Sequence, residues 1–348
     1  MTVPAYEPIS DDDLYRHSSQ FRIWSLTPEE LESKRRAVYE RACRNVPGAI
    51  AKDKNVPETS IEVLSYEEEQ QLIQYYSTKL LLLGDGLQQP TQVSATALSY
   101  FRKFYTVHST MEHHPKDIFS TCIFLAAKVE NNLIKIDYLC KVLRKNQKEI
   151  LDCEFLVLQS LSFTLLVHNG YRPMRGLLLD IQAVIPHLAP PEALEPLRLK
   201  TKKAIIDSFF SDVQFHFTPP QIALAALMTA DETLTMEYLK KKFGHDGIEL
   251  LRKDNPVIDT KGVSDLQMLL EIIEECRKMI QSVPQVPDQM GKATDRKLYY
   301  LYNPDKQAKR KLARAEAPEV SPAPSAPSAP TAPASTGSPE PKRQKMDD

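Results

Sequence analysis

The residues of this sequence that could do catalytic chemistry are few and poorly grouped. The phosphate-loop pattern GxxxxGK, the dinucleotide pattern GxGxxG, the nucleophile pattern GxSxG and the zinc pattern HExxH are all absent. His108 and Glu112-His113-His114 could bind a metal, but they fall beside Pro115 between two expected helices, where polar linker residues are usual. Asp11-Asp12-Asp13 could chelate a hard cation, although an acidic N-terminal arm accounts for them better. We therefore expect no catalytic residue, no cofactor site and no metal site in this chain.

Two charged residues stand out because each is alone on an apolar stretch. Lys128 is the only charge within residues 118–129, and Glu154 directly precedes the apolar run 155–163. Each side chain could simply reach solvent at the end of its helix. Alternatively, the two could form an ion pair at the edge of an apolar surface that docks a partner protein. The apolar neighbours that would supply contact in that case are Val129, Leu158 and Phe163.

The composition favours a soluble, intracellular and mostly helical protein. The 348 residues include only 10 Gly, so phosphate-binding loops and tight hairpins should be rare. The 44 basic and 46 acidic residues give a net charge of −2, which argues against a wholly basic nucleic-acid-binding chain. The five cysteines form no CxxC pair, so we expect free thiols in a reducing compartment. The N-terminus lacks the apolar core of a signal peptide, and no apolar run is long enough to span a membrane.

Helical patterns follow one another along the chain and must position these residues. Thr27, Pro28 and Glu30 predict a capping box that opens a helix running to about residue 44. A second amphipathic helix should end at Gly84, a residue suited to a left-handed C-cap. Residues 118–129 are apolar on every helical face, which predicts the central helix of a bundle. With these two, at 62–83 and 116–130, we expect helices at 91–109, 134–144 and 146–161 in this half of the chain.

An internal repeat and a biased C-terminus divide the chain further. The pattern Pro115-x-x-Ile118, followed by a helix rich in small apolar residues, recurs as Pro219-x-x-Ile222. We interpret the repeat as a bundle of about five helices used twice. Residues 318–341 consist almost entirely of Pro, Ala, Ser and Thr, a composition that predicts a disordered tail. The basic segments 306–314 and 342–346 are similar to nuclear-import signals.

Several segments resemble one protein family. YFRKFYTVHSTMEHHPKDIFSTCIFLAAKVE (100–130) followed by CEFLVLQSLSF (153–163) resembles a cyclin box. Three more segments, YRHSSQFRIW (15–24), HNGYRPMRGLLLDI (168–181) and FTPPQIALAALMTA (217–230), resemble the H-type branch of the cyclins. The resemblance implies an all-α protein with two tandem five-helix cyclin folds, flanking N- and C-terminal helices and a disordered C-terminal tail. The flanking helices would lie at about 28–44 and 264–282.

The resemblance and the composition together predict five parts of the chain. They are an N-terminal arm and helix (1–61), a first cyclin box (62–168), a second cyclin box (169–263), a C-terminal helix (264–290) and a basic, Pro/Ala/Ser-rich disordered tail (291–348).

The resemblance also implies a function and a site. It implies a non-catalytic subunit that binds and activates a cyclin-dependent kinase of the CDK-activating type, which phosphorylates the RNA polymerase II C-terminal domain and the activation loops of other such kinases. The chain would be a single copy in a heterotrimer with that kinase and a RING-finger assembly factor, attached to the core of transcription factor IIH in the nucleus. Neither a membrane nor sequence-specific nucleic acid would be a partner. The family's kinase-binding positions fall on Lys128, Val129, Glu154, Leu158, Phe163 and Leu165.

The chain lacks one motif of the cell-cycle cyclins, and two other interpretations of its function are considered. Residues 71–83 lack the M-R-x-x-L substrate-docking motif of cell-cycle cyclins, and residues 174–178 imitate that motif only at the start of the second box. One alternative is another transcriptional cyclin, of the elongation or mediator type, against which the segment 15–24 argues. A second alternative is a DNA-binding cyclin-fold protein resembling transcription factor IIB. That protein would need a zinc ribbon and a basic folded body, and the first cysteine here is Cys43.

Overall fold

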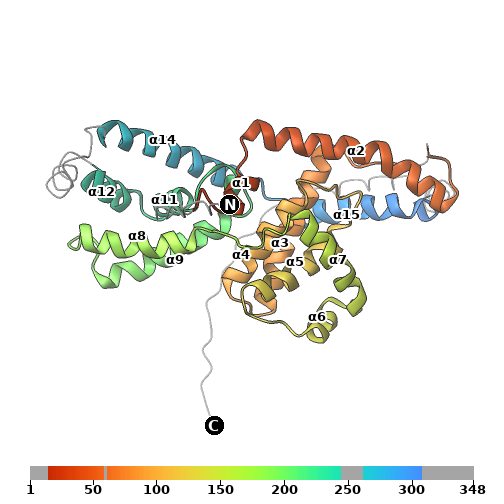
Figure 1. Cartoon of the computed structure of the whole chain (residues 1–348), viewed down its shortest axis with the longest axis horizontal. Coiled ribbons are helices and arrows are strands. Elements are labelled where there is room, and N and C mark those ends of the chain that lie inside the picture. Colours follow the sequence, from red (N-terminus) through yellow and green to blue (C-terminus); the bar gives the residue numbers. More distant parts are fainter. Residues whose placement is uncertain (1–14, 59–60, 244–261, 308–348) are drawn as a thin grey trace, which may run out of the picture. The chain divides into compact units, whose positions relative to one another are not determined.

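The computed structural model describes residues 15–58, 61–243 and 262–307, and within these ranges every regular element is a helix (Figure 1). None of these described helices is long and apolar enough to cross a membrane. The helices are α1 (Ser19–Trp24), α2 (Pro28–Lys54), α3 (Tyr66–Gly86), α4 (Thr91–Phe104), α5 (Pro115–Val129), α6 (Ile136–Leu143), α7 (Gln147–Ser160), α8 (Tyr171–Val184), α9 (Pro191–Ser208), α10 (Val213–His216), α11 (Pro219–Ala230), α12 (Glu232–Phe243), α14 (Gly262–Gln281) and α15 (Asp288–Tyr302).

The first bundle forms around α5. This helix packs against α3, α4 and α7, and its residues from Ile118 to Ala127 are all buried. Because its sequence is apolar on every face, burial on all sides is the arrangement that removes the most apolar surface from water. The prediction of a central helix is confirmed, and the sixth helix α6 packs on the edge of this bundle against α7.

The second bundle repeats this design around α11. Pro219 begins α11 as Pro115 begins α5, and α11 packs against α8, α9, α12 and α14. Ala223, Ala225 and Ala226 are fully buried, and their small side chains let neighbouring helices approach closely. The repeat inferred from Pro115 and Pro219 is therefore confirmed as a structural repeat.

The structure corrects the expected C-terminal parts. The helix predicted to flank the boxes at 264–282 corresponds to α14, which packs against α11 and α12 and so belongs to the second bundle. The helix that flanks the first bundle is α15, which packs against α3 and begins before residue 291, where disorder was predicted. Leu298 and Leu301 lie one turn apart and are buried, and this apolar spacing outweighs the basic composition. Residues 308–348, with the Pro/Ala/Ser-rich segment, lie outside the described residues.

Several helix boundaries also differ from the prediction, and α4 ends at Phe104 rather than at residue 109. The capping box at Thr27 is present, but α2 runs ten residues past the expected end near residue 44, to Lys54. Gly84 does not cap α3, which continues to Gly86. A Cβ atom at Gly84 would lie 2.2 Å from the Ser94 hydroxyl of α4, so this glycine serves the close approach of two helices.

Candidate docking site

The packing of α5 against α7 brings the two isolated charges together. The Lys128 ammonium donates to the Glu154 carboxylate, and it lies 4.7 Å from the centre of the Phe124 ring. The Lys128 side chain keeps 38% of its surface exposed and the Glu154 side chain 19%. The pair therefore lies at the edge of the core, open to solvent on one side: the ion pair is present, and docking of a partner beside it stays a prediction.

Apolar residues follow this ion pair along the ends of α5 and α7 and in the chain after α7. Val129, Leu158 and Leu165 are half-buried, whereas Phe163 is 61% exposed. The structure adds a residue that the sequence did not single out: Phe155 is 62% exposed and packs edge-on against Phe163, with ring centres 6.4 Å apart. The sequence holds no signal that separates Phe155 from the apolar run around it. We call Lys128, Val129, Glu154, Phe155, Leu158, Phe163 and Leu165 the α5–α7 surface.

The turn after α7 holds Phe163 outward. Ser162 and Phe163 have φ angles of 52° and 56°, in the left-handed region that L-residues rarely adopt. Backbone hydrogen bonds maintain the turn, with the Phe163 amide donating to the Leu158 carbonyl at 3.0 Å. Such a conformation costs on the order of 1 kcal/mol per residue and tends to occur at functional sites. The turn thus leaves the large aromatic ring of Phe163 exposed to solvent.

Helix α1 and α4 fix the segment that follows the turn. The Trp24 indole donates to the Thr164 hydroxyl at 2.8 Å, and the Gln20 side chain exchanges two hydrogen bonds with the His168 backbone. The Tyr100 hydroxyl donates to the Leu165 carbonyl at 2.5 Å. These contacts hold the backbone of residues 164–168, so the half-buried Leu165 side chain has a defined position. Through Gln20 and Trp24, the segment 15–24 holds the backbone on both sides of Leu165 in the α5–α7 surface.

The residues first considered as metal ligands have structural partners. The Glu112 carboxylate accepts two hydrogen bonds from the Arg41 guanidinium, at 2.9 and 3.1 Å. Burial works to raise the pKa of Glu112, but hydrogen bonds from His108, Arg41 and the Ser109 amide outweigh it and lower the pKa to about 2. The His114 ring accepts the Lys116 amide at 3.1 Å and so caps α5. Among the described residues, no group of three potential ligands could hold a metal ion, and Asp11-Asp12-Asp13 lie outside that part of the chain.

Family comparisons match both bundles. Residues 65–166 match the model of the cyclin N-terminal domain, and residues 169–281 match the model of the cyclin C-terminal domain. The second range includes α14, in agreement with the packing of that helix in the second bundle.

Several curated proteins are similar to the chain. Cyclin CCL1 of Saccharomyces cerevisiae is 40% identical over 250 residues, which cover 69% of this chain and 64% of that relative, less than two thirds of its length. Cyclin mcs2 of Schizosaccharomyces pombe is 33% identical over 299 residues, 84% of this chain and 86% of the relative. Cyclin-H of Xenopus laevis is 34% identical over 227 residues, 62% of this chain and 68% of the relative.

Two solved structures contain a chain with a similar fold. One is a CAK complex from Chaetomium thermophilum bound to ATP-gamma-S, with 25% identity, a TM-score of 0.70, and coverage of 91% of this chain and 100% of that chain. The other is yeast TFIIK, a complex of Kin28, Ccl1 and Tfb3, with 34% identity, a TM-score of 0.58, and coverage of 76% of this chain and 100% of that chain.

Proposed function

The chain belongs to the cyclin family, in the branch that includes cyclin H, and from this we propose that it binds and activates a cyclin-dependent kinase of the CDK-activating type. In this role the chain is a regulatory subunit, and the ATP site and the phosphoryl-transfer groups belong to the kinase. The substrates of the complex would be the C-terminal domain of RNA polymerase II and the activation loops of other cyclin-dependent kinases.

One observation carries this proposal. The similar chains of known structure come from a CAK complex and from TFIIK, and the chain covers the whole of each matched chain. Cyclin relatives in yeasts and in Xenopus support the same branch of the family.

The site that we propose for kinase docking is the α5–α7 surface. Its two exposed phenylalanines are the kind of residue that supplies most of the free energy of binding at protein interfaces. The ion pair of Lys128 and Glu154 beside them gives the surface one positive and one negative group, which would orient the kinase. The family's kinase-binding positions, carried onto this sequence, support the same placement.

Activation would follow from a shift in the conformation of the kinase. A protein kinase is active only when a Lys–Glu ion pair orients ATP and the activation loop is ordered. A rigid helical surface that binds only the inward position of the kinase's regulatory helix would favour that state. A shift from 1:99 to 99:1 would take about 5.5 kcal/mol of differential binding.

We place the chain in a nuclear assembly. A RING-finger assembly factor would be the third subunit, as the presence of Tfb3 in the yeast TFIIK structure suggests, and the trimer would attach to the core of transcription factor IIH. The basic segments 306–314 and 342–346 would direct nuclear import.

Reconstitution tests the proposed function. The chain is co-expressed with a CDK-activating kinase subunit and its RING-finger partner, and phosphorylation of a peptide from the RNA polymerase II C-terminal domain is measured on the purified complex. We expect all three chains to co-purify and the kinase to be nearly inactive when the chain is omitted. Recovery of the chain without the kinase, or equal activity without the chain, would refute the proposal.

A further inference from the structure

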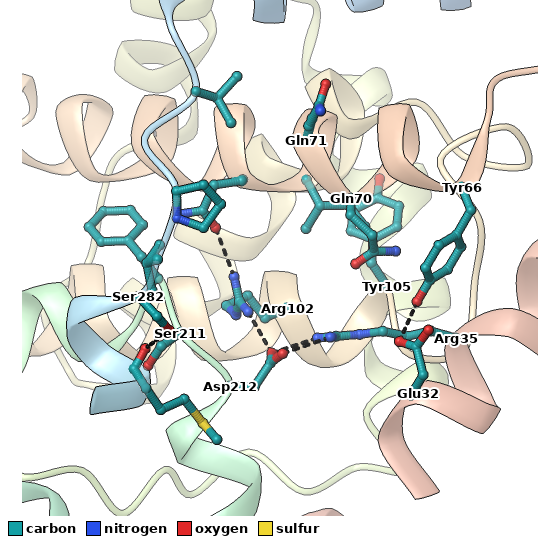
Figure 2. Close-up of a pocket in the computed structure, with 17 residues that line it drawn as sticks. Glu32, Arg35, Tyr66, Gln70, Gln71, Arg102, Tyr105, Ser211, Asp212 and Ser282 are labelled. Carbon is teal, nitrogen blue, oxygen red and sulfur yellow. Dashed lines mark hydrogen bonds and ion pairs between the residues drawn. The ribbon is translucent and has the colours of Figure 1, made fainter. Parts of the chain in front are cut away.

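A cavity of about 330 Å³ lies where residues of the two bundles meet (Figure 2). Helices α2, α3 and α4 line one side of it, and residues 210–212 with the chain after α14 line the other. The cavity is large enough for a group several times the size of a water molecule. It shares no residue with the α5–α7 surface. The proposed function assigns it no role.

Two buried arginines converge on one carboxylate in this cavity. Arg35 of α2 donates to both oxygens of Asp212, at 2.7 and 2.8 Å, and Arg102 of α4 donates to one of them at 2.7 Å. Figure 2 shows the Arg102 guanidinium above the Asp212 carboxylate and the Arg35 guanidinium to its right. The Arg35 side chain is 13% exposed and the Arg102 side chain 7% exposed. Both residues therefore carry a charge with little access to water.

The positive charge in this cluster exceeds the negative charge. The remaining carboxylate in the lining, Glu32, already pairs with Arg36 at 2.6 Å on the solvent side and accepts the Tyr66 hydroxyl at 2.7 Å. Arg35 and Arg102 must thus share Asp212. The Arg102 Nε atom is buried and has no hydrogen-bond partner, although Nη1 donates to Gln74 at 3.2 Å. Burial lowers the pKa of Arg102, and repulsion from Arg35 adds to that effect. A buried, incompletely paired charge of this kind is unfavourable until an anion joins it.

We propose that the cavity binds an oxyanion of phosphate size, held by Arg35 and Arg102. Guanidinium groups form short, charge-assisted hydrogen bonds with phosphate oxygens, and they bind them in pairs. Gln70 lines the cavity with its amide directed toward the Arg35 side in Figure 2, where it can donate a further hydrogen bond. The oxyanion could be free inorganic phosphate or the phosphate of a phosphorylated side chain.

Thermal unfolding of the full chain in increasing inorganic phosphate, at constant ionic strength with chloride as balance, tests this site. We expect a saturable rise in the midpoint, because a ligand that binds only the folded state stabilises it. Arg102→Gln is a poor test because this buried residue also supports the fold. Gln70→Glu keeps both arginines and places a carboxylate where the oxyanion would bind. Gln147→Glu introduces the same charge on the exposed first turn of α7 and is the matched control.

We expect Gln70→Glu to weaken phosphate binding at least tenfold and Gln147→Glu to leave it unchanged. O-phosphoserine, titrated in parallel, identifies the source. Tighter binding of O-phosphoserine supports a phosphorylated side chain, and tighter binding of inorganic phosphate supports the free ion. An unsaturable shift, or equal affinity in Gln70→Glu and the unmodified chain, would overturn the proposal.

Discussion

At the scale of the residue, the first bundle contains a lysine in an unusual environment. Lys103 of α4 is 1% exposed, and its Nζ atom has no hydrogen-bond partner and lies 5.6 Å from the centre of the Trp24 ring. Burial lowers the pKa of Lys103 to about 7, because the uncharged amine is easier to remove from water than the ammonium. Folding therefore works against protonation at this position.

We predict that the free energy of unfolding rises between about pH 7 and pH 9 through this residue. An exposed lysine in the unfolded chain titrates near pH 10.4, so the unfolded state binds about half a proton more than the folded state at pH 7 and nearly one more at pH 8 to 9. Stability rises with pH wherever the unfolded state binds more protons, here by up to about 1.4 kcal/mol per pH unit. Urea unfolding at pH 7, 8 and 9 would measure the slope.

Lys103→Met should flatten this slope and stabilise the chain at pH 7, because it keeps the apolar stem and removes the charge. Lys200→Met, at an exposed position of α9, is the control and should leave the slope unchanged. Parallel pH profiles for Lys103→Met and the unmodified chain would contradict the assignment of the slope to this residue.

The sequence predicts the environment of some of these residues and not of others. Lys128 and Glu154 could be identified because each is the sole charge beside an apolar stretch. Arg102 and Lys103 could not, because charged residues are normally exposed and both are buried here. Phe155 could not be separated from the apolar run around it, because only the fold decides which of those side chains faces solvent.

At the scale of the element, α15 is held on α3 by close packing and polar contacts. The Tyr76 hydroxyl donates to Asp295 at 2.6 Å, and Lys79 donates to Asp288 at 2.8 Å. A Cβ atom at Gly291 would lie 2.2 Å from the Tyr75 ring, and Tyr75 is itself buried. The missing side chain at Gly291 is therefore what allows α15 to approach α3.

We predict that Gly291→Ala displaces α15, because the new methyl group meets a buried ring that cannot move freely. The expected cost is about 1 to 3 kcal/mol, the range for overpacking. Hydrogen exchange should show faster exchange in α15 while the amides of α5 remain protected.

Gly176→Ala is the matched control for this change. A Cβ atom at Gly176, in the middle of α8, has no neighbour within 4 Å. Alanine there should stabilise the helix by about 0.5 to 1 kcal/mol. If the two variants have the same effect, the contact of Gly291 with Tyr75 does not limit the packing of α15.

At this scale the sequence predicts where helices form better than it predicts which helices pack against one another. The buried spacing of Leu298 and Leu301 was obscured by the basic residues around them, so α15 was assigned to a disordered tail. The sequence predicts Gly84 as a helix cap because glycine readily adopts the left-handed conformation, whereas its role is to allow Ser94 of the neighbouring helix α4 to approach. Both errors concern tertiary contacts, which local composition does not encode.

At the scale of the whole described unit, the junction of the two bundles depends on residues far apart in sequence. Arg35 and Asp212 are 177 positions apart, and the repeat that predicted two bundles contains neither residue. The repeat predicts two bundles because each needs a central apolar helix. It does not predict their junction, because polar pairs between domains leave no periodic pattern.

We predict that Asp212→Ala destabilises the chain by about 3 kcal/mol. The change would leave two buried guanidinium groups without their shared carboxylate, and the loss of one partner of a buried ion pair costs this order of free energy. Urea unfolding would measure it, with Asp137→Ala, at an exposed position of α6, as the control. A loss below 0.5 kcal/mol would show that the cluster does not hold the junction.

The α5–α7 surface is our proposed site for binding and activating a cyclin-dependent kinase, and reversal of its ion pair is the decisive test of this role. The Lys128→Glu/Glu154→Lys double variant keeps the two residues paired with each other but presents the opposite polarity to a partner. We predict that the kinase activity that co-purifies with the double variant falls at least tenfold, while the midpoint of its thermal unfolding is unchanged. Lys200→Glu is the control and should leave the co-purified activity unchanged. Full kinase activity in the double variant would contradict the claim.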